Sequence, residues 1–278
     1  MNLIVKNMEK VTEKNGKHKG LDTKSIEDLV RIINDEDKNV ALAVQQKLPE
    51  IAHLIEIVVS KLEIGGRLFY FGSGTSGRLG ILDASECPPT FGVSYEKVIG
   101  LIAGGDAAIR KAVEHAEDDR NLASKELIDL SVSKNDIVIG ISASGSTPYV
   151  LGGLSFCKKA GITCAALSCN PGSEIGRIAD YCIEVVVGPE VVRGSTRMKA
   201  GTAQKMVLNM ISTASMIALG HVKDNLMVDM KLSNSKLKTR GTNMLVELTG
   251  LTVDEASVLL EEHKSVRNAL DYLEAKDK

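Results

Sequence analysis

Short, almost continuously apolar runs alternate with helix-length segments after Gly65-Gly66. Such runs are typical of parallel strands that are buried on both faces of a sheet, and the intervening segments are long enough for crossover helices. The pattern predicts an α/β fold with a doubly wound, five-stranded parallel sheet in the flavodoxin-like order 2-1-3-4-5. The predicted strands span residues 67–71, 98–102, 137–141, 163–167 and 182–187.

The chain in front of the sheet is predicted to be helical. The pattern becomes helical from Ser25. Asp35 or Asp37 can cap a second helix, in which apolar positions recur with three- and four-residue spacing over residues 40–62. Pro49 lies inside the pattern and is expected to kink or split it. This amphipathic stretch can pack on its own domain or on a second subunit, and the sequence leaves both open. Residues 1–20 are polar and are expected to be mobile.

A second helical region, residues 195–220, follows the last strand. It is apolar on nearly all sides, which indicates a helix buried in the core or in a subunit interface. Arg193, Arg197 and Lys199 lie near its start. They can assist an anion or cover an interface, and the sequence does not choose between these roles.

The last part of the chain, residues 243–273, predicts three short helices. We therefore expect an N-terminal helical arm (residues 1–54), a central α/β domain (55–222) and a small C-terminal helical, UBA-like domain (223–278).

Composition argues against several classes of function. The chain has 278 residues, 44% of them hydrophobic, which suffices for a sizeable core. A net charge of -2 and 3% aromatic residues leave no basic excess for a nucleic-acid backbone and few rings for base stacking. The N-terminal apolar run is too short for a signal peptide, and no run of about 18 apolar residues occurs. We expect a cytoplasmic protein without nucleic-acid or membrane partners.

Cysteine and histidine spacing predicts neither disulfides nor a metal centre. The five cysteines include no C-x-x-C pair, and none of the five histidines has a partner at ligand spacing. We expect reduced core thiols and no bound metal.

Two predicted strands run directly into loops of glycine and hydroxyl residues. The first loop is Gly72-Ser73-Gly74-Thr75-Ser76-Gly77, and the second is Ser142-Ala143-Ser144-Gly145-Ser146-Thr147. Accessible backbone N–H groups, hydroxyl donors and the positive end of a following helix all favour a phosphate. In the order 2-1-3-4-5 these strands are neighbours at the switch point of the sheet. The sequence therefore predicts one pocket for one phosphorylated ligand.

The first loop also matches the dinucleotide fingerprint G-x-G-x-x-G. That fingerprint needs an acidic residue about 20 residues on, at the end of the second strand. Here the second strand ends in Ala103-Gly104-Gly105, and Asp106 lies too far along the chain. A ligand-free turn is disfavoured as well, because a turn does not need hydroxyls repeated after another strand.

Two acidic positions are candidates for proton transfer. Glu86 precedes Pro88-Pro89, which are expected to end any helix begun after Gly77. The helix dipole there favours a protonated carboxyl, which can donate a proton at neutral pH. Glu117 belongs to an acidic run that is by default a solvated helix face. A glutamate at a helix end, such as Glu86, is also more commonly a surface residue than a proton donor.

Five stretches resemble one family in order and spacing: GSGTSGRLGILDASECPPTFG, AEDD, SASGSTPYV, SCNPGS and GSTRMKAGTAQKMVLNM. They are similar to the N-acetylmuramic acid 6-phosphate etherases, lyases of the sugar isomerase (SIS) fold, from about residue 33 to the end of the chain. The resemblance implies a cytoplasmic homodimer of bacterial cell-wall recycling that needs no metal or cofactor. It also implies removal of D-lactate from the sugar, with N-acetylglucosamine 6-phosphate as the other product.

The resemblance also implies roles for individual residues. Glu86 maps to the acid that assists lactate departure, and Glu117 maps to the base. If the chain from Thr75 to Glu86 were all helix, Glu86 would lie about 16 Å from the phosphate loop. Either Gly80 breaks that helix, or the two carboxyls approach one pocket in a dimer, which we predict. The implied substrate contacts are Ser73, Thr75, Ser76, Ser142, Ser144, Ser146 and Thr147.

Three other functions stay open at this point. A sugar-phosphate isomerase of the same fold would use the same loops with a different base. A non-catalytic sugar-phosphate sensor, similar to glucokinase regulatory proteins, would bind without turnover. A DNA-binding regulator is disfavoured, because the N-terminal region has no basic helix-turn-helix pattern.

Overall fold

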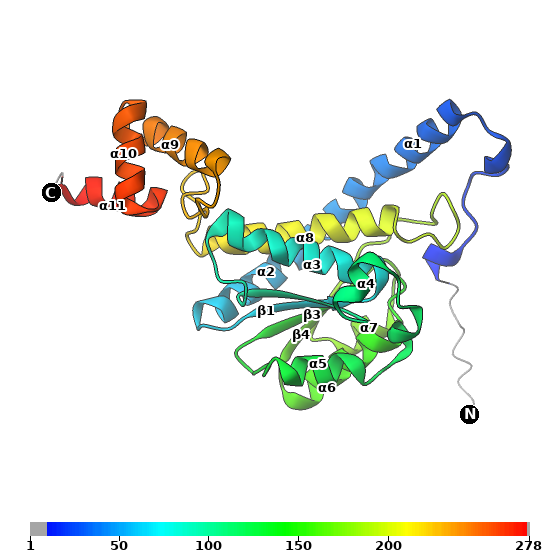
Figure 1. Ribbon diagram of the computed structural model, residues 1–278. Coiled ribbons are helices and arrows are strands. Elements are labelled where there is room, and N and C mark those ends of the chain that lie inside the picture. The colour runs from blue at the N-terminus through cyan, green and yellow to red at the C-terminus, as the bar shows by residue number, and fades with distance from the viewer. Residues whose placement is uncertain (1–9, 277–278) are drawn as a thin grey trace.

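The computed structural model describes residues 10–276 and has a five-stranded parallel sheet at its centre (Figure 1). The strand order is β2-β1-β3-β4-β5, which confirms the predicted order. In chain order the strands are β1 Leu68–Gly72, β2 Val98–Ile102, β3 Ile137–Ser142, β4 Thr163–Ser168 and β5 Tyr181–Glu184.

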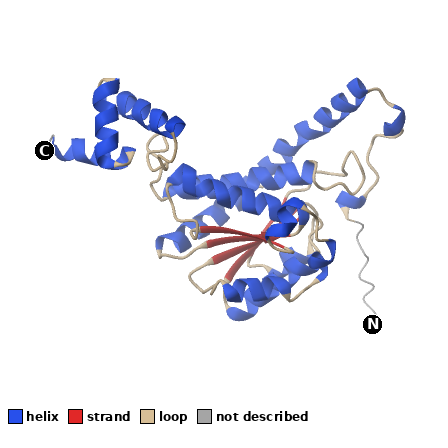
Figure 2. Cartoon of the chain, in the orientation of Figure 1, coloured by secondary structure: helices blue, strands red, loops and turns tan. Residues whose placement is uncertain are grey.

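Helices cover both faces of the sheet (Figure 2). Because side chains alternate along a strand, Leu68 and Tyr70 enter one core while Phe69 and Phe71 enter the other. One face is covered by α2 Leu48–Glu63, α3 Gly74–Phe91 and α8 Lys199–Ala218, and the other by α5 Leu122–Asp129, α6 Pro148–Ala160 and α7 Glu174–Ile178.

The predicted helical pattern from Ser25 is confirmed, but the predicted cap at Asp35 or Asp37 is wrong. α1 spans Ile26–Gln45 and is capped by Ser25, whose Oγ accepts the Asp28 N–H at 3.1 Å. Asp35 and Asp37 lie inside α1 and cap nothing, because the acceptor at Ser25 starts the helix ten residues earlier. The predicted split is confirmed: Pro49 lies in the first turn of α2, where its missing N–H is not needed.

The prolines Pro88 and Pro89 do not end α3, contrary to the prediction. They lie in its last turns, and the helix continues to Phe91 before Gly92 caps it in the left-handed region. Their missing N–H groups leave only two carbonyls without helical partners, while Cys87 and Phe91 are buried in the core. Gly80 does not break the helix either. It allows close packing, since a Cβ there would lie 3.0 Å from the Tyr70 Cβ.

The described part of the N-terminal segment is packed against the α/β domain, so the expected mobility is wrong for residues 10–20. Thr12 is fully buried, and its N–H donates to Asn170 Oδ1 at 3.3 Å. Arg193 Nε donates to the carbonyl of Glu13 at 2.7 Å. Residues 1–9 lie outside the described part of the chain. Tertiary hydrogen bonds therefore hold a segment whose composition alone indicated a free end.

Three short helices follow α8 in the C-terminal region, as predicted. They are α9 Ser235–Thr249, α10 Val253–His263 and α11 Val266–Lys276, and α9 begins earlier than expected because Asn234 caps it. They bury a hydrophobic cluster of their own, with Leu245, Leu260 and Leu270 among its members. Figure 1 shows this region at the far end of α8 from the N-terminal half of α1. Within residues 10–276, none of the helices combines the length and apolarity that crossing a bilayer requires.

Candidate active site

The two hydroxyl loops lie side by side at one edge of the sheet. β1 and β3 pair in parallel, with Gly72 opposite Ile141, so the loops that follow them leave the sheet at the same edge. Glycine is required at this point, because a Cβ on Gly72 would lie 2.8 Å from the Ile141 carbonyl oxygen. At the same edge α4, Asp106–Arg110, follows β2. The structure thus brings together the loops that the sequence assigned to one pocket.

The second loop gathers four hydroxyls in front of α6. Ser142 Oγ lies 2.7 Å from Thr147 Oγ1 and 3.2 Å from Ser144 Oγ, and Ser144 Oγ lies 3.3 Å from Ser146 Oγ. Gly145, at φ +71°, donates its N–H to Ser142 Oγ at 3.1 Å. Thr147 is the N-cap residue of α6, a helix of 13 residues. Hydroxyl donors and a positive helix end therefore face the same small volume.

The first loop divides its hydroxyls between two directions. Ser73 is the N-cap residue of α3 and makes no capping hydrogen bond with its side chain. Thr75 lies against α8, where a Cβ on Gly201 would be 3.3 Å from its methyl group. Ser76 is buried, and its hydroxyl donates to Gln204 Oε1 at 3.0 Å. The Ser76 hydroxyl thus already has a partner on α8.

Glu117 shares a cavity with the first loop. It lies on a 3-10 helix, Glu114–Asp118, and lines a cavity of about 150 Å³ together with Ser73, Gly74 and Arg78. Arg78 donates to the carbonyls of Ala108 and Ile109 at 2.7 and 2.8 Å, which ties α3 to α4. Arg78 closes the GSGTSGR stretch but is not among the predicted site residues. An exposed carboxylate therefore lies within the cavity of the predicted phosphate loop.

Glu86 is on the same helix as the first loop but far from it. Because α3 is continuous from Gly74 to Phe91, the Cα atoms of Thr75 and Glu86 are about 16 Å apart. Glu86 is exposed, and Asp83, one turn earlier, is buried. Asp83 accepts hydrogen bonds from Asn209 Nδ2 at 2.7 Å and Ser212 Oγ at 3.0 Å. Burial raises the pKa of Asp83 above its usual range. These bonds to α8 fix the direction in which Glu86 points.

Two basic residues near the start of α8, Arg193 and Lys199, have partners in the N-terminal part of the chain. Lys199 is 2% exposed, and its Nζ donates to Glu36 Oε2 on α1 at 2.6 Å. The backbone N–H groups of Lys199 and Ala200 both donate to the buried carboxylate of Glu190 at 2.9 Å. The positive N-terminal end of α8 is therefore neutralised by a carboxylate of the same chain. Sequence spacing had no signal for Glu36, which is 163 positions from Lys199, and Glu190 acts from the loop just before α8.

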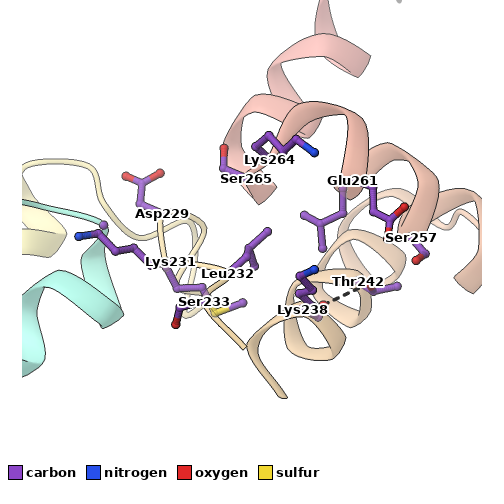
Figure 3. Close-up of a pocket in the computed structure, with 13 residues that line it drawn as sticks. Asp229, Lys231, Leu232, Ser233, Lys238, Thr242, Ser257, Glu261, Lys264 and Ser265 are labelled. Carbon is purple, nitrogen blue, oxygen red and sulfur yellow. Dashed lines mark hydrogen bonds between the residues drawn. The ribbon is translucent and has the colours of Figure 1, made fainter. Parts of the chain in front are cut away.

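A cavity of about 560 Å³ lies away from the loops, between residues 229–233 and helices α9 and α10 (Figure 3). The ammonium groups of Lys231 and Lys264 lie on opposite sides of it and point away from each other. Lys231 stacks over the Tyr95 ring instead, 4.8 Å from its centroid. This cavity lacks the converging donors that the strand ends provide.

Three buried cysteine thiols of the described chain are unreactive. Burial raises the pKa of Cys87, Cys157 and Cys169 to about 12, so these thiols stay protonated at neutral pH. Among the described side chains, which are those of residues 10–276 except Glu114, no three His, Cys, Asp or Glu side chains are grouped so that they can hold a metal ion.

Comparison with known proteins defines the class of the chain. The glucokinase regulatory protein N-terminal SIS domain matches residues 50–158, and the SIS domain matches residues 109–214. A putative phosphosugar isomerase of Bacteroides fragilis, known from a crystal structure, is 17% identical, with a TM-score of 0.53, over 71% of this chain and 94% of that one. Phosphoheptose isomerase from Neisseria gonorrhoeae is 16% identical, with a TM-score of 0.54, over 69% and 98%. The fold is that of a SIS-domain protein.

Relatives of high identity narrow the class to one family. N-acetylmuramic acid 6-phosphate etherase of Christiangramia forsetii is 54% identical over 94% of this chain and 95% of its own length. The etherase of Porphyromonas gingivalis is 53% identical over 96% and 98%, and etherase 1 of Bacillus licheniformis is 53% identical over 90% and 83%. The chain belongs to the N-acetylmuramic acid 6-phosphate etherase family.

Proposed function

We propose that this chain is a carbon–oxygen lyase that cleaves the D-lactyl ether of N-acetylmuramic acid 6-phosphate. The products are N-acetylglucosamine 6-phosphate and D-lactate. The observation that carries the proposal is the 54% identity to a named etherase over 94% of the chain. The paired hydroxyl loops at adjoining strand ends support it, because they suit the phosphate of such a sugar.

The phosphate is bound by donors of both loops. Ser142, Ser144 and Thr147 offer clustered hydroxyls at the N-terminus of α6, and Ser146 extends the cluster. From the first loop, Ser73 and Thr75 contact the phosphate. Ser76, in the same turn, also belongs to the phosphate site. Its hydroxyl donates a hydrogen bond to Gln204 and so links α3 to α8.

Two carboxyls carry the chemistry in this proposal. Once the sugar ring opens, the aldehyde acidifies the hydrogen on the neighbouring carbon, and Glu117 removes that proton. The electron pair forms a carbon–carbon double bond as the lactyl ether leaves the next carbon, and Glu86 protonates the departing oxygen. Water then adds to the unsaturated aldehyde with the proton steps reversed. Base and acid need different pKa values, which two separate environments can supply.

In this proposal Glu86 and Glu117 act in one pocket that a second subunit completes. α2 and α8 leave a largely apolar groove of about 610 Å³, lined by Leu48, Ile55, Met206 and Met210 among others. Asn209, the hydrogen-bond partner of Asp83, also lines this groove, so the helix that carries Glu86 is hydrogen-bonded to a residue of the groove. We propose a homodimer formed through this face, with each site completed by the partner.

Two further features belong to the proposal. Residues 1–54, 55–222 and 223–278 form an arm, a SIS domain and a small helical domain, and the separate hydrophobic cluster of the last part supports the final boundary. The reaction takes place in the cytoplasm without a cofactor, metal, nucleic acid or membrane.

Incubation with N-acetylmuramic acid 6-phosphate and an enzymatic assay of D-lactate tests the function. We expect lactate and N-acetylglucosamine 6-phosphate in equal amounts, and loss of lactate release in Glu86→Gln with phosphosugar binding retained. A ketose product without lactate would identify an isomerase. Binding without any turnover would identify a sensor.

A further inference from the structure

A lysine from the N-terminal segment reaches the second hydroxyl loop. Lys10 Nζ donates a hydrogen bond to Ser146 Oγ, although the two residues are 136 positions apart in sequence. The loop itself contains only Ser, Ala, Gly and Thr between Ser142 and Thr147. Lys10 therefore adds a full positive charge to a cluster that otherwise consists of neutral donors.

The segment that carries Lys10 is fixed to the same loop by a buried amide. Asn170 is 3% exposed, and its Nδ2 donates to Thr12 Oγ1 at 3.0 Å and to the Ala143 carbonyl at 2.9 Å. Its Oδ1 accepts the Thr12 N–H. The Asn170 side chain thus joins Thr12 to the backbone of the second hydroxyl loop. Because Thr12 is two residues from Lys10, this link holds Lys10 near that loop.

Other nearby cations are already engaged. Arg78 donates to two backbone carbonyls, and Lys199 is buried against Glu36. Within the described residues, Lys10 is the lysine whose ammonium group donates a hydrogen bond to a hydroxyl of the second loop. A phosphate monoester carries a charge of about −1.5 to −2 at neutral pH, and a charge-assisted hydrogen bond is roughly twice as strong as a neutral one.

We propose that Lys10 is a phosphate-binding residue of this site. When the phosphate occupies the loop, the Lys10 ammonium bonds a phosphate oxygen, and the Thr12–Asn170 hydrogen bonds hold the segment over the loop as a strap. The inference rests on the proposed function, because it takes the loop to be the phosphate subsite. It adds a charged contact from a segment outside the SIS domain, which the family resemblance did not assign.

Kinetics of Lys10→Met test the proposal, with Lys14→Met as the matched control. Lys14 is exposed on the same segment, and its substitution makes the same change in net charge. We expect Lys10→Met to raise KM about 10- to 100-fold, the loss of one hydrogen bond to a charged group, with kcat little changed. Lys10→Arg should recover most of the affinity. Lys14→Met should match the wild type.

The pH dependence of product binding distinguishes a phosphate contact from a structural role. Titration calorimetry of N-acetylglucosamine 6-phosphate should show wild-type affinity rising as the phosphate loses its second proton near pH about 6. This rise should flatten in Lys10→Met. A variant that bound less tightly by the same factor at every pH would overturn the proposal, as would an unchanged KM in an enzyme that releases lactate.

Failure of the proposed function is a separate outcome. If the wild type binds the phosphosugar but releases no lactate, the etherase assignment fails, while calorimetry still decides the role of Lys10. If Lys10→Met is poorly folded, Thr12→Val provides the second test. It leaves the lysine in place but removes the side-chain half of the Thr12–Asn170 contact, and we expect a smaller loss of phosphosugar affinity with a partly flattened pH dependence. Unchanged affinity in Thr12→Val would contradict the strap.

Discussion

Complementation between two inactive variants tests whether each active site is shared by two subunits. In one chain, continuous α3 places Glu86 about 16 Å from Thr75, whereas Glu117 lines a cavity with Ser73. If the partner supplies Glu86, then Glu86→Gln and Glu117→Gln damage different halves of each site. Each homodimer should lose about 10²- to 10⁴-fold in lactate release, the usual contribution of a general acid or base.

The rate of lactate release by mixed dimers distinguishes a shared active site from two separate ones. When Glu86→Gln and Glu117→Gln chains pair at random in equal amounts, about half of the dimers are mixed. Each mixed dimer has one site with both substitutions and one site with neither. Lactate release of the mixture should therefore return to about one quarter of the wild-type rate. Mixed dimers purified through two different affinity tags should reach about one half.

The assay is D-lactate release after the two variants are expressed together. Each variant expressed alone, then combined without subunit exchange, is the control and should stay inactive. If both carboxyls served the site of their own chain, every site in a mixed dimer would lack one of them. A purified mixed dimer no more active than either homodimer would refute the shared site.

Three further variants test the binding loop and the supporting ion pairs. Ser144→Ala should raise the KM for the phosphosugar several-fold through loss of a loop donor, as initial-rate kinetics would show. Glu36→Leu leaves the buried Lys199 ammonium unpaired and should cost about 3–5 kcal/mol, seen as a lower melting temperature, whereas Glu36→Leu with Lys199→Met should recover most of it. Burial favours the neutral form of Asp136, but hydrogen bonds from Arg67 and neighbouring backbone outweigh it and lower the pKa of Asp136. Its stabilisation is present above pH about 4 and is lost as pH falls through the lowered pKa, so acid-melting curves of Asp136→Asn should lack this loss.

The sheet was predictable because its strands carry their signal locally. β2 matches the predicted residues 98–102, and the other strands begin or end within a few residues of their predicted bounds. Strand order followed from the rule that neighbouring parallel strands flank a switch point. Helix ends were harder, since caps and tertiary packing decide them. Pro88 and Pro89 are the clearest case: burial of the surrounding turn outweighs the lost helical hydrogen bonds.

The candidate site was predictable only in part, for a similar reason. Both hydroxyl loops are continuous in sequence and follow recognisable strands, so their joint position could be inferred. The bonds of Thr12 to Asn170 and of Lys10 to Ser146 join residues more than a hundred positions apart. No periodicity or spacing marks such pairs. The described part of a segment that composition suggested to be mobile is instead hydrogen-bonded to the second hydroxyl loop and to Asn170, which the three-dimensional structure reveals.

The rigidity of α3 connects these observations. A flexible connection between the first loop and Glu86 would allow one subunit to bring its own acid to the phosphate pocket. Instead Gly80 packs α3 closely on Tyr70, and Asp83 joins it to α8 through two hydrogen bonds. A helix held at both points cannot fold back on its own N-terminus. The same α8 also lines the exposed apolar groove. In the homodimer that we propose, the helix that fixes the position of α3 would therefore lie at the interface with the second copy.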